Sequence, residues 1–71
     1  MTRDEARRAL SGLVEKYIEC GSSRQRLLAK IANPNLVEVP VRGVLHEIRQ
    51  AGGRVRPEDE DLVSELVYYF G

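Results

Sequence analysis

The chain has 71 residues, of which 42% are hydrophobic and 31% are charged, and its formal net charge is zero. These values are typical of one globular domain and argue against a disordered chain. No run of about 18 apolar residues occurs, so we expect no membrane-spanning helix. The first residues, MTRDEARR, alternate charges and lack the apolar segment of a secretory signal, so we expect a cytoplasmic protein.

A capping-box pattern at Thr2 and Glu5 predicts that a first helix begins at about residue 3. Apolar residues then recur at spacings of three and four, which places them on one helical face. These residues are Ala6, Leu10, Leu13, Val14, Tyr17 and Ile18. We expect this helix to reach Cys20 and to end at Gly21, in the left-handed conformation that often terminates helices.

A second capping-box pattern, from Ser22 to Gln25, predicts the start of a second helix. Its apolar face would contain Leu27, Leu28 and Ile31. The helix should end near Ala32, because Pro34 cannot continue it and disfavours helical geometry at the residue before it.

Two prolines predict the starts of a third and a fourth helix. Proline fits the first helical position, where its missing N–H removes no hydrogen bond, so we place Pro40 and Pro57 there. The third helix would run to the glycine pair at 52–53, and the four acids at 58–61 suit the positive end of the fourth helix's dipole. The two apolar faces would contain Val41, Val44, Leu45 and Ile48, and Leu62, Val63, Leu66, Val67 and Phe70.

The predicted fold is therefore an all-α domain spanning residues 1–71, a compact bundle of about four short amphipathic helices. Residues 37–39 and 54–56 are short and contain valine, so a very short β-pairing between them is an alternative to two loops. A chain of this size buries only about 60% of its unfolded surface, which makes further burial against a partner or a second copy attractive.

The stretch LLAKIANPNLVEVPVRGVLHEIR, residues 27–49, contains two predicted helices joined by a corner, as a helix-turn-helix does. In a DNA-reading helix-turn-helix the turn has about three or four residues. If the third helix begins at Pro40, the connection covers residues 33–39 and is too long. If it begins at Leu36, Pro40 lies inside the helix at a cost of about 3 kcal/mol. We therefore expect a weak match to this motif.

The charges are unevenly distributed along the chain. All eleven lysines and arginines lie in residues 1–56, together with six acids, whereas residues 57–71 hold five acids and no base. One interpretation is a surface that contacts DNA or RNA within residues 24–56. Its residues would be Arg24, Arg26, Lys30, Arg42, His46, Arg49 and Arg54. The other interpretation is a solvated face whose charge is balanced by the acidic fourth helix.

Residues that carry enzyme chemistry are few. One histidine and one cysteine cannot assemble a metal cluster, and His46 has no second histidine at the metalloprotease spacing. Cys20 would lie at a helix C-terminus, where the dipole disfavours a thiolate, so we expect a small packed side chain. A disulfide between two copies is the alternative role of this thiol. We expect no catalytic, metal, cofactor or small-molecule substrate site, and no enzymatic activity.

Three of the four aromatic residues lie among the last four residues, in LVYYFG. Phe70 continues the apolar face of the predicted fourth helix, whereas Tyr68 points elsewhere. The aromatic side chains either dock onto the first helix or anchor a partner, since tyrosine is enriched at interface hot spots.

Together these observations predict a small, non-enzymatic interaction module that binds a protein partner or a second copy of itself. The expected interface residues are Tyr68, Tyr69 and Phe70, with Arg54 and Arg56 at the rim. From its size we expect an accessory or regulatory factor of phage, plasmid or bacterial origin. The alternative function is a helix-turn-helix-like regulator that binds DNA or RNA through the basic face.

Overall fold

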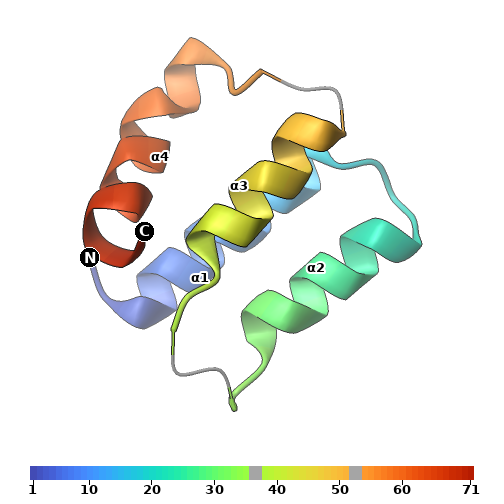
Figure 1. The fold of residues 1–71 in the computed structure, drawn as a ribbon, viewed down its shortest axis with the longest axis horizontal. Helices are drawn as coiled ribbons and strands as arrows, with labels where there is room; N and C mark the ends of the chain where they lie inside the picture. The colour runs from blue at the N-terminus through green and yellow to red at the C-terminus, as the bar shows by residue number, and fades with distance from the viewer. Residues whose placement is uncertain (36–37, 52–53) are drawn as a thin grey trace.

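The computed structural model describes residues 1–35, 38–51 and 54–71, and within these ranges it contains four helices (Figure 1). They are α1 (Arg3–Tyr17), α2 (Ser22–Ala32), α3 (Val41–Gln50) and α4 (Pro57–Phe70). The prediction of an all-α bundle is confirmed. Residues 38, 39 and 54–56 form no strand, and residue 37, the remaining part of the alternative pairing, lies outside the described residues.

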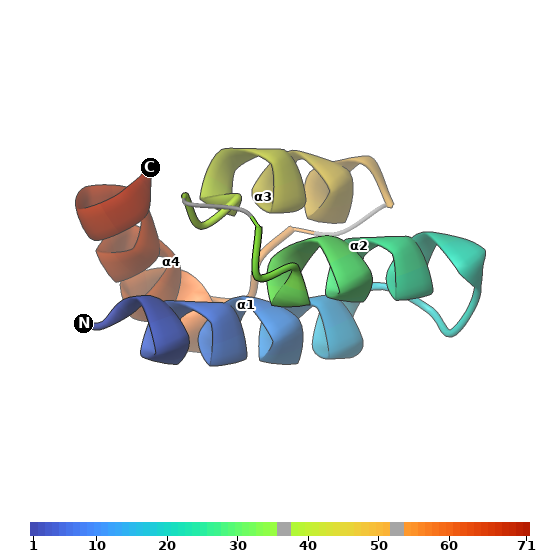
Figure 2. The ribbon, with the colours of Figure 1, turned by 90° about the horizontal axis from the view of Figure 1, so that it is seen from below.

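The helices pack in two layers. α3 lies over α1, with α2 on one side and α4 on the other (Figure 1). α1 and α3 run in the same direction and α2 runs in the opposite one, and both chain ends lie on the same side of the molecule (Figure 1, Figure 2). The Cα atoms extend 28 × 27 × 15 Å, and the short dimension fits two stacked helices with axes about 8–10 Å apart. The radius of gyration is 11.1 Å, as expected for a compact chain of this length.

The predicted start of α1 is confirmed, but α1 ends earlier than predicted. Thr2 N donates to Glu5 Oε1 and Glu5 N donates to Thr2 Oγ1, each at 3.1 Å, which completes the capping box. α1 stops at Tyr17, because Ile18 adopts an extended conformation that directs its side chain into the core. The prediction that Cys20 is a packed residue at a helix end is therefore wrong, since Cys20 is exposed in the connection to α2.

The predicted caps between α1 and α2 are also wrong. Gly21 has a φ of 166°, which is extended backbone and not the left-handed conformation, and it is the N-cap of α2. Ser22 is already the first helical residue, and no side chain caps α2. The physical reason is the early end of α1, which leaves residues 18–21 to form the connection to α2.

The corner between α2 and α3 is too long for a helix-turn-helix, as predicted. It covers residues 33–40, because Pro40 is the N-cap of α3 and Val41 is its first helical residue. Asn33 shapes its beginning: Asn35 N donates to Asn33 Oδ1 at 3.0 Å, the local side-chain turn that asparagine favours. Val39, inside this connection, is 3% exposed and contributes to the core.

The core is drawn from all four helices and from two connections. Its fully buried side chains include Leu10, Ile31, Ile48 and Leu66, which come from α1, α2, α3 and α4 in turn. Other predicted core residues of α1, α2 and α4 are only partly buried and pack around this cluster. They are Tyr17, Leu28, Leu62, Val63 and Phe70. Val67 is the exception to the predicted apolar faces, because 41% of it is exposed.

Candidate interaction surface

The last turn of α4 exposes three consecutive large apolar residues, Val67 (41%), Tyr68 (82%) and Tyr69 (54%). A helix turns by about 100° per residue, so five successive apolar residues cannot all face one core. Leu66 is fully buried and Phe70, one turn later, packs against the core, so the three residues between them point away. They are the only exposed large hydrophobic residues among the described parts of the chain.

The two tyrosine rings contact each other and form a raised feature that we call the aromatic ridge (Tyr68 and Tyr69). Their centroids are 5.0 Å apart and their planes are nearly perpendicular, at 88°. This edge-to-face arrangement is a favourable geometry for two aromatic rings. Tyr69 also lies 6.4 Å from the Phe70 ring, which connects the ridge to the core. The ridge is therefore held in place from below while its outer surface remains in solvent.

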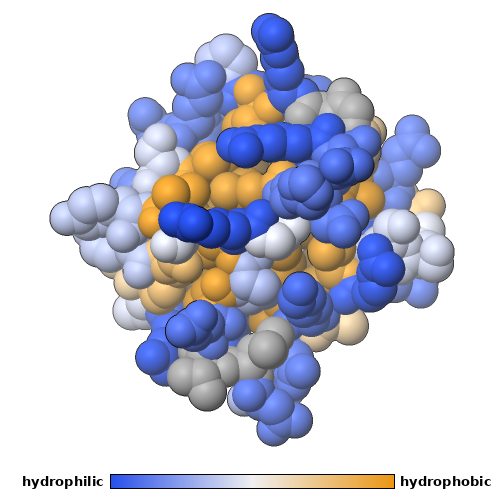
Figure 3. All heavy atoms as spheres, in the orientation of Figure 1, coloured by the Kyte–Doolittle hydropathy of each residue, from blue (hydrophilic) through white to orange (hydrophobic). Residues whose placement is uncertain are grey.

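A hollow of about 370 Å³ separates this turn of α4 from α3; we call it the α3–α4 hollow. Its lining residues are Arg42, Leu45, His46, Arg49 and Val67. Figure 3 shows apolar atoms exposed between α3 and α4 on this face, with charged side chains around and across them. The hollow thus combines an apolar floor with cationic walls.

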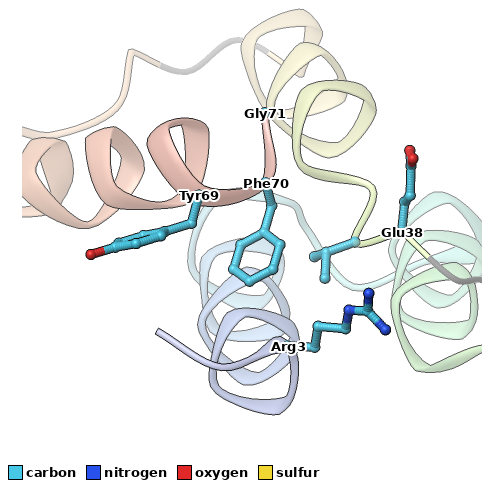
Figure 4. A pocket seen from close by; sticks show the side chains of 6 residues that line it. Arg3, Glu38, Tyr69, Phe70 and Gly71 are labelled. Carbon is cyan, nitrogen blue, oxygen red and sulfur yellow. The ribbon is translucent and has the colours of Figure 1, made fainter.

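A second hollow, of about 420 Å³, lies on the opposite side of the same turn and is lined by both ends of the chain. Its residues are Arg3, Glu38, Val39, Tyr69, Phe70 and Gly71. Figure 4 shows the Phe70 ring between α1 and the segment at Glu38, whereas Tyr69 points away from Arg3 and Glu38. The aromatic ridge is therefore flanked by a shallow depression on each side.

The fold brings most of the predicted basic face together. A third hollow, of about 380 Å³, lies between α2 and α3 and is lined in part by Arg26, Lys30 and His46. His46 also lines the α3–α4 hollow, so Arg42 and Arg49 continue the same surface. Arg26 lies 4.0 Å from Glu47, a loose ion pair in which both side chains are exposed to solvent.

Two of the predicted basic residues do not line these hollows. Arg24 is half-buried in the first turns of α2, and Arg54 is exposed in the connection before α4. Arg54 and Arg56 also do not lie at the rim of the aromatic ridge. They precede α4, whereas the ridge is at its other end, and 14 helical residues span about 21 Å.

Sequence reasoning missed a polar cluster that joins the end of α1 to the start of α4, which we call the polar clamp. Lys16 Nζ lies 2.7 Å from Glu58 Oε1 and 2.8 Å from Asp59 Oδ2. The Tyr17 hydroxyl donates to Asp59 and accepts a hydrogen bond from the backbone N–H of Arg56 at 2.9 Å. The sequence shows Tyr17 only as part of an apolar stripe, although a tyrosine at the edge of such a stripe has a hydroxyl that needs a partner.

The clamp shifts the pKa values of Asp59 and Lys16. The hydrogen bonds from Lys16 and then from Tyr17 lower the pKa of Asp59 below its usual value. The same contact with Asp59, with a further one to Glu58, raises the pKa of Lys16. Both shifts favour the charged forms, as expected when a carboxylate and an ammonium group are hydrogen-bonded to each other. The clamp therefore stabilises the position of α4 and has a structural role.

Within the described residues, no group of three or more His, Cys, Asp and Glu side chains could hold a metal ion. None of the helices in these ranges has the length and apolar character needed to cross a bilayer. Comparisons of the chain with protein-family models, with curated proteins and with solved structures found no significant match.

Proposed function

We propose that this protein is a small, non-enzymatic interaction module whose partner is another protein chain. The observation that carries the proposal is the exposure of Val67, Tyr68 and Tyr69 in a single turn of α4. Elsewhere the described chain buries its large apolar residues wholly or in part. A contiguous apolar patch on a small domain marks a surface that another molecule covers.

The chemistry of the patch favours a protein over a small molecule. Tyrosine contributes a large contact area and a hydroxyl at little cost in conformational entropy, and it is enriched at hot spots. The hollows on both sides are open and shallow, whereas small-molecule sites enclose most of the ligand. Arg42 and Arg49 beside Val67 can orient a partner through its carboxylates.

The two alternatives for the C-terminal aromatics apply to different residues. Phe70 packs against the core, so it belongs to the fold. Tyr68 and Tyr69 carry the proposed contact, whereas Arg54 and Arg56 lie at the other end of α4 and outside it. A cytoplasmic accessory or regulatory factor, of phage, plasmid or bacterial origin, remains the role that we propose for such a module.

A photocrosslinking residue placed at Tyr68 tests the proposal in cells of the source organism. We expect discrete adducts with a protein, which is either a different chain or a second copy. The matched control is the same residue at Gln25, which is exposed on α2, on the other side of α3 from α4 (Figure 1). The absence of protein adducts at position 68, or equal adducts at both positions, would contradict the proposed function.

A second candidate function is binding of DNA or RNA. It is favoured by one observation, the continuous basic surface of Arg26, Lys30, Arg42, His46 and Arg49 across α2 and α3. Binding of this kind weakens steeply with salt, because the cationic side chains replace counterions on the phosphates. Arg42→Glu combined with Arg49→Glu should abolish binding to a generic duplex. Retention of binding in this double variant would remove the candidate.

A further inference from the structure

Building on the proposed function, we infer that the partner is a second copy of this chain, with the two α4 helices packed antiparallel about a two-fold axis. The inference rests on the distribution of charges along α4 and beside it. α4 holds five acids and no base, and the exposed apolar residues are confined to its last turn. The two ends of its exposed surface are therefore chemically different.

The acids near the start of α4 divide into two sets. Glu58 and Asp59 are paired within the chain, both with Lys16 and Glu58 also with Arg56 at 3.8 Å. Glu60 and Asp61 are exposed and belong to none of the ion pairs within the described residues. These two carboxylates are thus exposed to solvent and form no ion pair within the described residues.

The complementary set lies beside the other end of α4. Arg42 and Arg49 are exposed on α3, line the α3–α4 hollow with Val67, and also form no ion pair within the described residues. Within one chain α4 does not bring Glu60 and Asp61 to these arginines, because the two acids precede Val67 by six or seven helical residues, a rise of about 9–11 Å along the helix. Another copy of α4, running in the opposite direction, can.

Helical geometry indicates which residues of the two α4 helices would meet. Glu60, Ser64 and Val67 are all exposed and lie at spacings of four and three, so they share one edge of α4, on the side of the α3–α4 hollow. Ser64 is small and close to the middle of the helix, so a two-fold axis beside it allows close approach. Residue 60 of one copy then lies beside residue 68 of the other, and residue 61 beside residue 67.

In this arrangement the unpaired charges of each copy find partners on the other copy, so the same set of contacts forms twice. Glu60 and Asp61 of each copy meet the Tyr68 hydroxyl and the arginines of the α3–α4 hollow on the other copy. Val67 and Tyr68 of each copy are covered by the opposite helix. An isologous contact of this kind closes with two chains and leaves no repeating surface for a filament.

Charge reversal tests the pairing. One variant carries Glu60→Arg and Asp61→Arg, and the other carries Arg42→Glu and Arg49→Glu. Sedimentation equilibrium of the wild-type chain should show a dimer whose dissociation constant rises with salt. Each variant alone should dissociate about tenfold or more readily, because like charges then face each other. An equimolar mixture of the two variants should recover a one-to-one dimer, since opposite charges face each other again.

A control with the same change in charge is Glu15→Arg plus Glu19→Arg, two exposed residues of α1 and its C-terminal connection. This control should dimerise like the wild-type chain, and circular dichroism should show unchanged helix content in every variant. If the reversal at Glu60 and Asp61 unfolds α4, the milder pair Glu60→Gln and Asp61→Asn replaces it. The milder pair should weaken the dimer to a smaller extent.

The outcomes separate this inference from the proposed function. A wild-type chain that stays monomeric at millimolar concentration overturns the second copy as partner. Photocrosslinking from Tyr68 to a different protein would then leave the proposed function intact. A dimer that neither reversal weakens, or a mixture that does not recover the dimer, also overturns the antiparallel pairing.

Discussion

At its N-terminal end α4 is held against α1 by the polar clamp, whereas at its C-terminal end it presents Val67 and the aromatic ridge to solvent. The polar end is thus tied to α1 by hydrogen bonds and ion pairs, whereas the apolar end is anchored by Leu66 and Phe70 and still leaves three large apolar residues exposed. If polar residues simply faced solvent and apolar residues simply faced the core, the acids at the start of α4 would be unpaired and the three apolar residues at its end would be buried. The difference indicates that the exposed apolar turn has a function and that the clamp keeps it in position.

The largest effect should come from removing the residue that anchors the apolar end. Leu66 is fully buried, so Leu66→Ala should lower the free energy of unfolding by about 2–5 kcal/mol. This is a large part of the total stability of a small domain, which is about 5–15 kcal/mol. Urea denaturation followed by circular dichroism measures the change. A loss below about 1 kcal/mol would mean that this end of α4 is not anchored as described.

Removing the clamp hydroxyl should have an intermediate effect. Tyr17→Phe keeps the ring packed against the core but leaves the Arg56 N–H without its acceptor and Asp59 without one donor. We expect a loss of about 1–2 kcal/mol in the free energy of unfolding. Amide hydrogen exchange should show faster opening in the first turn of α4 than in its last turn. Uniform acceleration along α4 would contradict a local clamp.

Acidification should weaken the clamp in a predictable direction. The pKa of Asp59 is lower in the folded chain than its ordinary value of 3.8. Its contribution to stability is therefore present above pH 3.8 and is lost as pH falls through the lower, folded-state pKa. Asp59→Asn should be less stable than the wild-type chain near neutral pH, and the difference should shrink in acid. Thermal unfolding of both proteins as a function of pH measures this difference in stability. A difference that grows in acid would contradict a lowered pKa of Asp59 in the folded chain.

The smallest effect on stability should come from the aromatic ridge. Tyr68 is 82% exposed, so Tyr68→Ala should change the free energy of unfolding by no more than about 0.5 kcal/mol. The same substitution should reduce dimer formation, because Tyr68 lies in the proposed interface. Phe70→Ala is the matched contrast, since Phe70 packs against the core and should destabilise the fold. Equal losses of stability in both variants would place Tyr68 in the fold.

Local sequence signals located the helices well, because their causes are local. The Thr2 and Glu5 capping box and Pro57 begin helices where predicted, and the helix-period apolar stripes contain most of the core. The errors occur where a distant contact outweighs a local preference. Ile18 leaves the helix to place its side chain in the core, so α1 ends early and Gly21 becomes a cap of α2.

The candidate site was predictable only in part. The sequence indicated that Tyr68 would point away from the apolar face, and the structure places it 82% exposed. It could not indicate that Val67 lines the α3–α4 hollow, since that depends on how closely the two helices pack. Arg54 and Arg56 were joined to the ridge because they carry the right charge, but the length of α4 separates them from it.

The sequence by itself determined four amphipathic helices, their approximate bounds and the excess of acid in residues 57–71, because periodicity, caps and charge are properties of neighbouring residues. Only the tertiary structure decided which apolar residues stay exposed and which charges find partners. Lys16 and Asp59 are separated by 42 residues in the sequence and meet because α4 lies beside α1. The Tyr17 hydroxyl reaches Asp59 for the same reason. Such contacts depend on how whole helices are placed relative to one another, and local sequence patterns do not contain that information.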